Sequence, residues 1–309
     1  MTATRAEAEP RPIVPLGTGP KGLPGRYEDD RVVVDRGERQ RGRRTLGWVR
    51  TPHFDVGRQG HRIHLVHWLP TSSIDDDLTG VLAEELFDPG WVSGADAFER
   101  IFTGVVMSSM DDPLDGWELF YRNTLGRLVQ PPPRTTAAYG TIDDYRPVYQ
   151  RAVSLVPPGE VLELGCCFGF LSLQLAARDG VHVVASDVSA GTVSLLDAMQ
   201  HRLGADLGTL VADAARVPLP DRHVDTVLAV HLLEHLNQED GAGVVAEALR
   251  LARHRVVVAV PFEVEPSVEL GHVRVFDLES LAALAVGLDP GWRATVSAHH
   301  GGWLVIDRT

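Results

Sequence analysis

The sequence predicts an α/β fold: a doubly wound, seven-stranded, mostly parallel sheet in the carboxyl-terminal part, preceded by a smaller α+β region. Two observations lead to this prediction. Beyond about residue 136, short runs rich in Val, Ile and Leu alternate with helical stretches, and near-continuous apolar strands are typical of a parallel sheet covered on both faces. Polar or glycyl residues end successive runs, which is where open α/β sheets bind their ligands.

The composition narrows the class of protein. The 309 residues suffice for one large or two modest domains, and a hydrophobic content of 44% can fill a substantial core. The formal charge of −13 disfavours nucleic acid and anionic membrane surfaces as partners. Cys166 and Cys167 are adjacent, which rules out a disulfide framework, and neither a leader nor a run of about 20 apolar residues indicates export or a membrane span. We therefore expect a cytoplasmic protein.

Composition also divides the chain into three parts. Residues 1–29 form a proline-containing polar stretch, which we expect to be a disordered tail. Residues 30–135 predict an α+β substrate or accessory domain, and "QPPPRT" marks a stiff boundary before the domain of residues 136–309. In the middle part we expect two strands and then two helices, the first helix with a serine cap and an acid-rich first turn: "RVVVD", "RIHLVHWLP", "TSSIDDDLTGVLAEELF" and "DGWELFYRNTLGRLV".

Two features of the middle part admit a functional and a structural interpretation. Residues 31–62 hold nine arginines against three acidic residues, which indicates either a basic face for RNA or, as we favour, a solvated surface that pairs with acidic neighbours. Trp91, Trp117 and Phe120 could stack on a sugar in an acceptor cleft, but core packing is the simpler expectation.

The carboxyl-terminal part contains seven strand candidates. The last two lack an intervening helix, so we expect them to form an antiparallel edge. The first four end in the turn from Glu163 to Gly169, in Asp187, in Asp213 and in His231. The candidates are "EVLELG", "HVVASD", "GTLVAD", "DTVLAV", "RVVVAVP", "WRATVSA" and "GWLVIDR". Before the first of them, a helix carries three tyrosines that we expect to be core aromatics, namely Tyr139, Tyr145 and Tyr149.

The first strand runs into "VLELGCCFGF", a glycine-containing turn. A dinucleotide site needs G-x-G-x-x-G, and this chain offers Gly165 and Gly169 without a third glycine at the required offset, so a dinucleotide is not expected. Cys167 stands at a glycine position. Because cysteine resists positive φ, either the turn keeps an ordinary backbone angle or the ligand is displaced.

Residues Glu163 to Gly169 resemble the E/D-x-G-x-G-x-G first motif of the class I S-adenosylmethionine-dependent methyltransferases, and the resemblance extends over residues 139–309. "VPLPDRHVDTVLAVHLLEHL" is similar to the family's stretch into the fourth strand. The resemblance implies S-adenosylmethionine as cofactor, with Glu163 orienting the turn and the cofactor's amino group. It further implies close backbone approach at Gly165, Cys167 and Gly169, ribose hydroxyls on Asp187, adenine at Asp213 and the Ala214 amide, and the sulfonium beside His231.

The segment "HLLEH" places His231, Glu234 and His235 at i, i+3 and i+4, on one face of a helical turn. The spacing matches the H-x-x-E-H pattern of inverted zinc metallopeptidases, although a motif that follows directly from a buried strand is not on the long helix those enzymes use. With His272 of "GHVRVFDLESL", the set also resembles the metal site of small-RNA terminal 2′-O-methyltransferases, whose first ligand is Glu where this chain has His231. That resemblance implies a divalent ion such as Mg²⁺ on His231, Glu234, His235 and His272; a hydrogen-bonded rim is the structural alternative.

A hydroxyl acceptor needs a base, because it is a weak nucleophile. His235 and His231 are the best-placed candidates, since histidine titrates near neutrality, and each can equally be a structural histidine. His299 and His300 in the last hairpin are weaker candidates.

Outside these motifs, "TPHFDV", "LVHWLP" and "GWELFYRNTLGRL" are similar to the mycofactocin oligosaccharide methyltransferases. That resemblance implies transfer to a glucose hydroxyl of a glycosylated redox cofactor, and so a small-molecule or oligosaccharide acceptor. The alternatives are a methyltransferase for RNA or a lipid quinone, and a non-catalytic cofactor-binding module that acts through partners.

Overall fold

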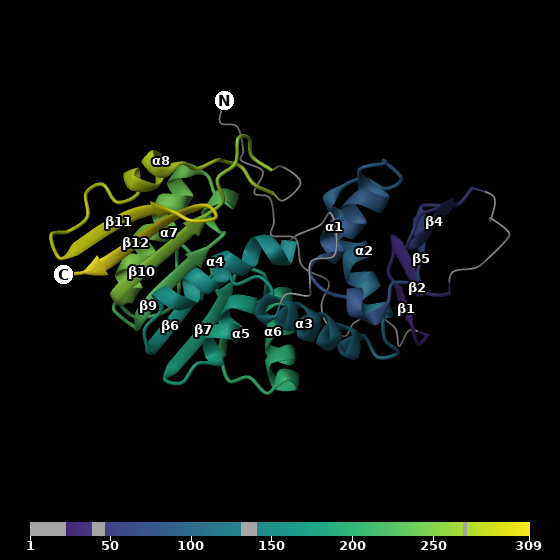
Figure 1. Ribbon diagram of the computed structural model, residues 1–309, viewed down its shortest axis with the longest axis horizontal. Helices are drawn as coiled ribbons and strands as arrows, with labels where there is room; N and C mark the ends of the chain where they lie inside the picture. The colour runs from purple at the N-terminus through teal and green to yellow at the C-terminus, as the bar shows by residue number, and fades with distance from the viewer. Residues whose placement is uncertain (1–22, 39–46, 131–140, 268–270) are drawn as a thin grey trace, which may run out of the picture. The chain divides into compact units, whose positions relative to one another are not determined.

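The computed structural model describes residues 23–38, 47–130, 141–267 and 271–309 (Figure 1). Two compact units are present: one contains Leu155–Gln200 and Ala205–Thr309, and the other contains the described residues before Leu155 together with His201–Gly204. Most of the predicted tail, the linker after Gln130 and Tyr139 lie outside the described residues. The expected tail reached residue 29, but its last part is ordered, because Arg26–Glu28 form strand β1.

The amino-terminal unit contains a five-stranded sheet in the order β1-β2-β5-β4-β3. Strands β2 and β5 are parallel and the other neighbours are antiparallel. Every second residue faces a buried side, where Val34, Phe54 and Leu65 are fully covered. The strands are β1 (Arg26–Glu28), β2 (Val32–Arg36), β3 (Val49–Arg50), β4 (Phe54–Gln59) and β5 (Arg62–His67).

The helices of this unit are η1 (Thr71–Ser73), α1 (Leu78–Leu82), η2 (Ala83–Phe87), α2 (Ala95–Ser108), α3 (Pro113–Val129) and α4 (Thr141–Leu155). The serine cap expected for the first of the predicted helices is wrong. Helix α1 begins after Asp77, whose side chain does not cap it: Asp75 and Asp77 bind Arg127 of α3, and Asp77 Oδ1 accepts from the Ile142 amide in the first turn of α4 at 3.0 Å. Helix α3 begins at Pro113, two residues before the segment predicted to be helical, and its cap is the Asp112 carboxylate, which accepts from the Leu114 amide.

The arginines of the Arg-rich segment that the structure describes are largely paired. Arg31 binds Asp96 at 3.2 Å, Arg50 binds Asp55 at 2.7 Å, and Arg62 binds Glu28. This pairing agrees with the solvated-surface interpretation and does not favour an RNA face. Trp117 and Phe120, 2% and 0% exposed, belong to the core as expected, whereas Trp91 is exposed.

The carboxyl-terminal unit contains a seven-stranded sheet in the order β11-β12-β10-β9-β6-β7-β8. Five neighbouring strands are parallel, and β12 is antiparallel to both β10 and β11. The predicted doubly wound sheet with an antiparallel edge is therefore confirmed. Its strands are β6 (Gly159–Leu164), β7 (Val181–Asp187), β8 (Gly208–Val211), β9 (Val224–Val230), β10 (Ala252–Val260), β11 (Trp292–Ala298) and β12 (Gly302–Arg308).

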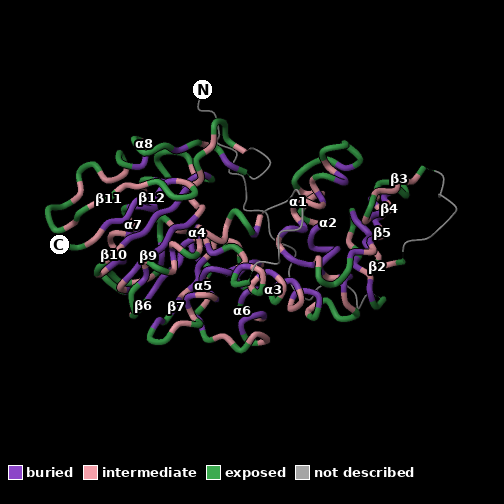
Figure 2. Tube along the Cα trace, viewed as in Figure 1, coloured by how far each residue is buried: buried purple, intermediate pink, exposed green. Residues whose placement is uncertain are grey.

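Helices cover this sheet, and its strands β6, β9, β10 and β12 are largely buried, whereas the residues of β8 and β11 are half-buried or exposed (Figure 2). Leu162, Val227, Val258 and Leu304, one from each of four strands, are fully covered. The helices are α5 (Phe170–Ala176), α6 (Ala190–Leu203), η3 (Leu233–His235), α7 (Gln238–Leu251) and α8 (Leu278–Ala283).

Among the described residues, no helix combines the length and the apolar character that crossing a membrane requires.

Candidate functional site

The candidate site lies where the carboxyl ends of the parallel strands meet. Strand β6 lies between β9 and β7, and the chain leaves it in one direction towards β7 and β8 and later continues with β9 and β10 on its other side. That reversal is the switch point at which open α/β sheets bind ligands. Glu163, Asp187, Asp213 and His231 follow or end neighbouring strands there, as the sequence predicts.

The turn after β6 needs its glycines for two reasons. Gly165 and Gly169 have φ values of 69° and 73°, in the left-handed region. A Cβ atom at Gly165 would lie 2.8 Å from Leu232 Cδ1, and one at Gly169 would lie 2.5 Å from Leu196 Cδ2. The turn is therefore packed closely against Leu232 and Leu196.

Cys167 keeps the glycine-like conformation of the turn. Its φ is 49°, so the expected alternative of an ordinary backbone angle is wrong. The Cys167 amide donates to Asp187 Oδ2 at 3.0 Å, which helps to hold a conformation that costs a non-glycine residue about 1 to 2 kcal/mol. Its thiol side is exposed, so the side chain does not occupy the core.

Glu163 is buried beneath this turn. Ser172 Oγ of α5 donates to Glu163 Oε2 at 2.5 Å, and Ser186 Oγ donates to the Glu163 carbonyl at 2.8 Å. Burial raises the pKa of Glu163 to about 7, and the Ser172 hydrogen bonds oppose this rise. The carboxyl group thus joins the first turn of α5 to β6 and is close to its titration point at neutral pH.

Asp187 and Asp213 organise the next two loops. Asp187 Oδ1 accepts from the Ser189 amide at 2.9 Å, while Oδ2 holds Cys167, so one carboxylate ties two loops together. Asp213 Oδ1 accepts from the Ala215 amide at 2.9 Å. Each carboxylate oxygen has a second lone pair, so both side chains can still accept hydrogen bonds from a ligand.

His231 does not share a helical face with Glu234 and His235. Its φ of 53° ends β9 in the left-handed region, and the short helix η3 begins only at Leu233, so the expected helical turn from 231 to 235 is wrong. The His231 amide donates to the Ala259 carbonyl at 2.9 Å, which fixes this bend to β10. The same short turn does not provide the long helix of a metallopeptidase.

Glu234, His235 and His272 form a compact group. One ligand atom from each lies within 4.8 Å of the others. His231, the fourth residue of the predicted set, is not in this group, but its Nδ1 lies 3.3 Å from Glu234 Oε1. The Val273 amide donates to the Glu234 carbonyl at 2.8 Å, so a backbone bond brings the distant His272 to η3.

In both histidines of this group, Nδ1 faces a hydrogen-bond acceptor. His235 Nδ1 lies 3.3 Å from the Gly271 carbonyl, and His272 Nδ1 lies 2.8 Å from Glu263 Oε2. Because the partners are acceptors, the Nδ1 atoms carry the protons and Nε2 is left with a lone pair on each ring. This is the arrangement in which histidine binds a metal or accepts a proton.

Burial and charge complete the group. Glu234 is 0% exposed, and neither of its carboxylate oxygens has a hydrogen-bond partner among the described residues. A buried carboxylate without hydrogen bonds is unusual unless a ligand satisfies it. The pKa of His235 is lowered, first by desolvation and further by the neighbouring histidines, although Glu234 opposes this. His235 is therefore mainly neutral at pH 7 and able to bind.

Two functional residues were missed from the sequence. Glu263 orients His272, and Ser172 holds Glu163; both act through another side chain, so no motif marks them. Of the other candidates, Tyr145 and Tyr149 contact each other on α4 with ring centroids 5.6 Å apart. His299 and His300 contact each other in the turn between β11 and β12 and do not join the Glu234 group.

Comparison with known proteins agrees with this geometry. Residues 161–255 match a family model described as "Methyltransferase domain". Over 106 residues the chain is 35% identical to a Mycolicibacterium smegmatis protein named "Probable S-adenosylmethionine-dependent methyltransferase", covering 34% of this chain and 38% of that protein. The chain thus spans well under half the length of this curated relative.

Solved structures with a similar fold have low sequence identity. The PH0226 protein from Pyrococcus horikoshii OT3 has a TM-score of 0.45 and 18% identity, over 54% of this chain and 90% of that one. Magnesium protoporphyrin IX methyltransferase (ChlM) from Synechocystis PCC 6803, with bound SAH, has a TM-score of 0.44 and 18% identity, over 61% of this chain and 94% of that one.

Proposed function

We propose that this chain, whose carboxyl-terminal unit contains a class I S-adenosylmethionine-dependent methyltransferase domain, methylates a hydroxyl group of a sugar or oligosaccharide. The observation that carries the proposal is the junction of β6, β7 and β9, where the glycine turn, Asp187 and the Glu234 group stand at one edge of the sheet. Bound S-adenosylmethionine would supply an activated methyl group on its sulfonium sulfur.

The cofactor would lie against the glycine turn. Gly165 and Gly169 would allow close backbone approach of the cofactor, and Cys167 has the same left-handed backbone between them. Asp187 would accept from the ribose hydroxyls through the lone pairs that its two amide donors leave unused. Glu163 would hold the turn and stabilise the cofactor's amino group.

The remaining cofactor contacts follow from the loops after β8 and β9. Asp213 and the Ala214 amide would bind the adenine, and His231 would lie beside the sulfonium. These assignments rest on the position of each residue at the end of its strand. The protein's contribution is to hold both reactants in line, and such positioning can lower a barrier by several kcal/mol, roughly 7 at the lower end of measured intramolecular cases.

Glu234, His235 and His272 fit a divalent metal. The group offers one buried carboxylate without hydrogen bonds and two imidazoles with available Nε2 atoms. A bound ion would polarise the acceptor hydroxyl and favour acceptors with neighbouring hydroxyl groups, such as sugars. In this arrangement His231 stays outside the ligand set and orients Glu234.

A metal-free alternative assigns His235 as the base. Its lowered pKa keeps the ring neutral, so Nε2 could accept the proton of the hydroxyl as the methyl group is transferred. The two roles exclude each other, because both use the same lone pair. Loss of activity after chelation, restored by added Mg²⁺ or Mn²⁺, would support the metal; full activity after chelation would support the base.

The acceptor follows from the resemblance to mycofactocin oligosaccharide methyltransferases, and the predicted cytoplasmic location stays a prediction. RNA as acceptor is less well supported, since four arginines of the Arg-rich segment pair with carboxylates: Arg31, Arg36, Arg50 and Arg62. A lipid quinone acceptor and a non-catalytic cofactor-binding module are the remaining alternatives. Tight cofactor binding without turnover on any acceptor would indicate the module.

One experiment tests the central assignment. S-adenosylhomocysteine binding is measured by calorimetry for the wild type, Asp187→Ala and Asp179→Ala, the last an exposed aspartate outside the site. Extracts rich in glycosylated metabolites are then incubated with cofactor and each variant. Intact-mass analysis detects each transferred methyl group as a mass gain of about 14 Da, the mass of one methylene. We expect Asp187→Ala to lose binding and turnover, while Asp179→Ala keeps both. Wild-type binding by Asp187→Ala would refute the assignment.

A further inference from the structure

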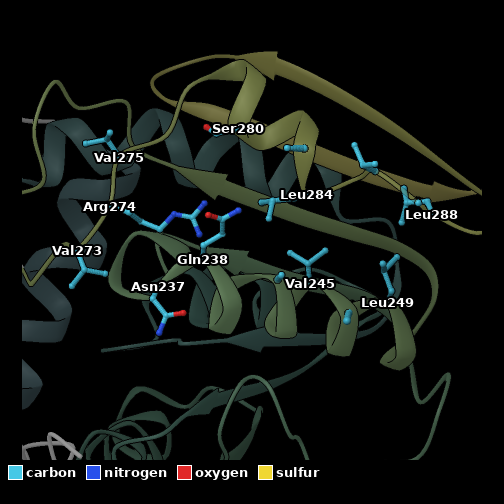
Figure 3. A pocket seen from close by; sticks show the side chains of 15 residues that line it. Asn237, Gln238, Val245, Leu249, Val273, Arg274, Val275, Ser280, Leu284 and Leu288 are labelled. Carbon is cyan, nitrogen blue, oxygen red and sulfur yellow. The ribbon is translucent and has the colours of Figure 1, made fainter. Parts of the chain in front are cut away.

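A groove of about 800 Å³ lies between α7, α8 and the segment that follows His272 (Figure 3). This volume falls within the roughly 300 to 1,000 Å³ typical of small-molecule sites. Apolar side chains from both helices form its length, and polar ones are at the end near the start of α7. The labelled lining residues are Asn237, Gln238, Val245, Leu249, Val273, Arg274, Val275, Ser280, Leu284 and Leu288.

Apolar surface is concentrated around this groove. Six large apolar side chains between residues 262 and 286 are exposed, and three of them line the groove itself: Val273, Val275 and Val286, at 59%, 39% and 83% exposure. Exposed apolar side chains gathered in one place indicate a binding surface.

Arg274 is a charged residue in this apolar setting. Its guanidinium forms no ion pair with the residues that the structure describes, and its NH1 atom is buried without a hydrogen-bond partner among them. Burial lowers the pKa of Arg274. The guanidinium lies 4.1 Å from the centre of the Phe276 ring, and this contact only partly replaces lost water.

The surroundings of Arg274 favour an anion. The guanidinium lies beside the first turn of α7, where a Cβ atom at Gly241 would come within 3.2 Å of NH1. Helix α7 has 14 residues, so the partial positive charge of its first turn adds to that of the arginine. The nearby carboxylate of Asp240 is engaged by Asn237 Nδ2 at 2.5 Å and does not neutralise Arg274.

We propose that the groove between α7 and α8 binds a monocarboxylate with a long apolar chain. Arg274 holds the carboxylate, a group that its planar fork can bind through two parallel hydrogen bonds. The chain lies between Val245 and Leu249 of α7 on one side and Leu284 and Leu288, which follow α8, on the other. The proposal concerns a binding site and does not depend on the methyl acceptor or on the metal.

The test uses decanoate and decan-1-ol, which differ only in the charged head. Calorimetry measures the affinity of the full-length protein for each compound. We expect saturable decanoate binding, about tenfold or more tighter than decan-1-ol binding, because hydrogen bonds to charged groups are the strong ones. Shortening the chain to butanoate should abolish measurable binding, since the apolar contacts are lost.

Three variants distinguish the contribution of the carboxylate to binding from that of the apolar chain. Arg274→Gln should lose the preference for decanoate and leave decan-1-ol binding unchanged, whereas Ala246→Trp, placed in the groove, should weaken both. Arg293→Gln, an exposed arginine on β11, serves as control and should bind decanoate like the wild type. Thermal unfolding and S-adenosylhomocysteine binding confirm that each variant is folded. Absence of saturable decanoate binding, or equal binding by Arg274→Gln, would overturn the proposal.

Discussion

Each unit of this protein contains a buried glutamate beside a histidine, and the two pairs differ in how the carboxylate is satisfied. In the amino-terminal unit, Glu85 accepts from Thr51 Oγ1 at 2.6 Å, from the His53 amide at 2.9 Å and lies 2.5 Å from His53 Nδ1. In the carboxyl-terminal unit, Glu234 has no hydrogen bond to either oxygen from the described residues, and His231 Nδ1 stands at 3.3 Å.

The difference indicates different roles for similar residues. The Glu85 carboxylate closes the turn of the "TPHF" segment and already uses three of its roughly four acceptor positions within the protein, so it is structural. Glu234 is buried more completely, yet neither of its oxygens accepts a hydrogen bond from the described residues, which is costly unless a ligand binds there. A glutamate–histidine pair is therefore not evidence of a site by itself; the number of unused acceptor positions distinguishes the two cases.

Removing the satisfied carboxylate should have the largest effect on stability. Glu85→Ala leaves the Thr51 hydroxyl and the His53 amide without their acceptor, and we expect the free energy of unfolding to fall by about 3 kcal/mol. Urea denaturation measures the change. Glu84→Ala, the exposed neighbour on the same turn, is the control and should change the stability by less than about 0.5 kcal/mol. Equal stability of the two variants would remove the basis of the comparison.

The unsatisfied carboxylate should behave in the opposite way. In metal-free protein, Glu234→Gln should alter stability little, because no hydrogen bond is lost. With Mn²⁺ at about 100 times its dissociation constant, the wild type should gain about 2.7 kcal/mol, and Glu234→Gln should gain much less. Thermal unfolding with and without the ion measures both. Glu239→Gln, exposed on α7, is the matched control, and the same Mn²⁺ response in Glu234→Gln would count against the site.

The orienting carboxylate of the open group should have a smaller effect. Glu263→Gln keeps the size of the side chain but weakens the bond to His272 Nδ1, so we expect metal affinity to fall by about 10- to 100-fold while the ligands themselves remain. Competition with a metal-sensitive dye measures the affinity. Glu265→Gln, exposed two residues away, should bind like the wild type. An unchanged affinity in Glu263→Gln would show that His272 is oriented by other contacts.

Glu163 lies between the two extremes, because one of its oxygens accepts from Ser172 and burial raises its pKa to about 7. If the ionised form binds the cofactor, affinity for S-adenosylhomocysteine should rise about tenfold from pH 6 to pH 8. Calorimetry at several pH values measures this, and Glu163→Gln should show a flat profile. A wild-type profile that is flat or falls would contradict the assigned role.

The same group has a consequence for stability. The pKa of this carboxyl group is higher in the folded than in the unfolded state. At low pH both states are protonated, so the group does not change the free energy of unfolding. Once the group is ionised it destabilises the folded state. The cofactor-free wild type should therefore lose stability between its ordinary pKa of 4.5 and about 7, relative to Glu163→Gln.

The smallest expected effect concerns the backbone of the site. Cys167→Gly removes a side chain from a residue with φ of 49°, and we expect a gain in stability of up to about 1 kcal/mol, since relief of the left-handed strain is partly offset by chain entropy. Urea denaturation measures it. Cys166→Ala, at a neighbouring buried cysteine, should not stabilise the protein. A loss of stability in Cys167→Gly would mean that the thiol makes a contact worth more than the strain.

The sequence predicts the carboxyl-terminal unit better than the details of the site. Its buried strands and their final antiparallel edge follow from local patterns, because parallel strands covered on both faces must be apolar throughout. The polar residues at the strand ends then lie close together, because the carboxyl ends of parallel strands are at the same edge of the sheet. The serine cap before α1 was wrong because Arg127, far along the chain, draws Asp75 and Asp77 into ion pairs.

Three-dimensional contacts decide what local patterns could not. Spacing alone put His231 on one helical face with Glu234 and His235, but the bend held by the Ala259 carbonyl places His231 before η3, with its Nδ1 still 3.3 Å from Glu234 Oε1. Glu263 and Ser172 act through a neighbouring side chain, whereas Arg274 matters because its NH1 atom has no hydrogen-bond partner among the described residues. Such roles depend on which atoms meet after folding.

The bond from the Cys167 amide to Asp187 has a kinetic consequence. Since Asp187 also holds Ser189, the loops after β6 and β7 are joined before any ligand arrives. Capture then requires no prior loop closure, so rapid-mixing traces should show a single phase whose rate rises linearly with ligand concentration. Cutting this tie would add a slow, concentration-independent phase to those traces.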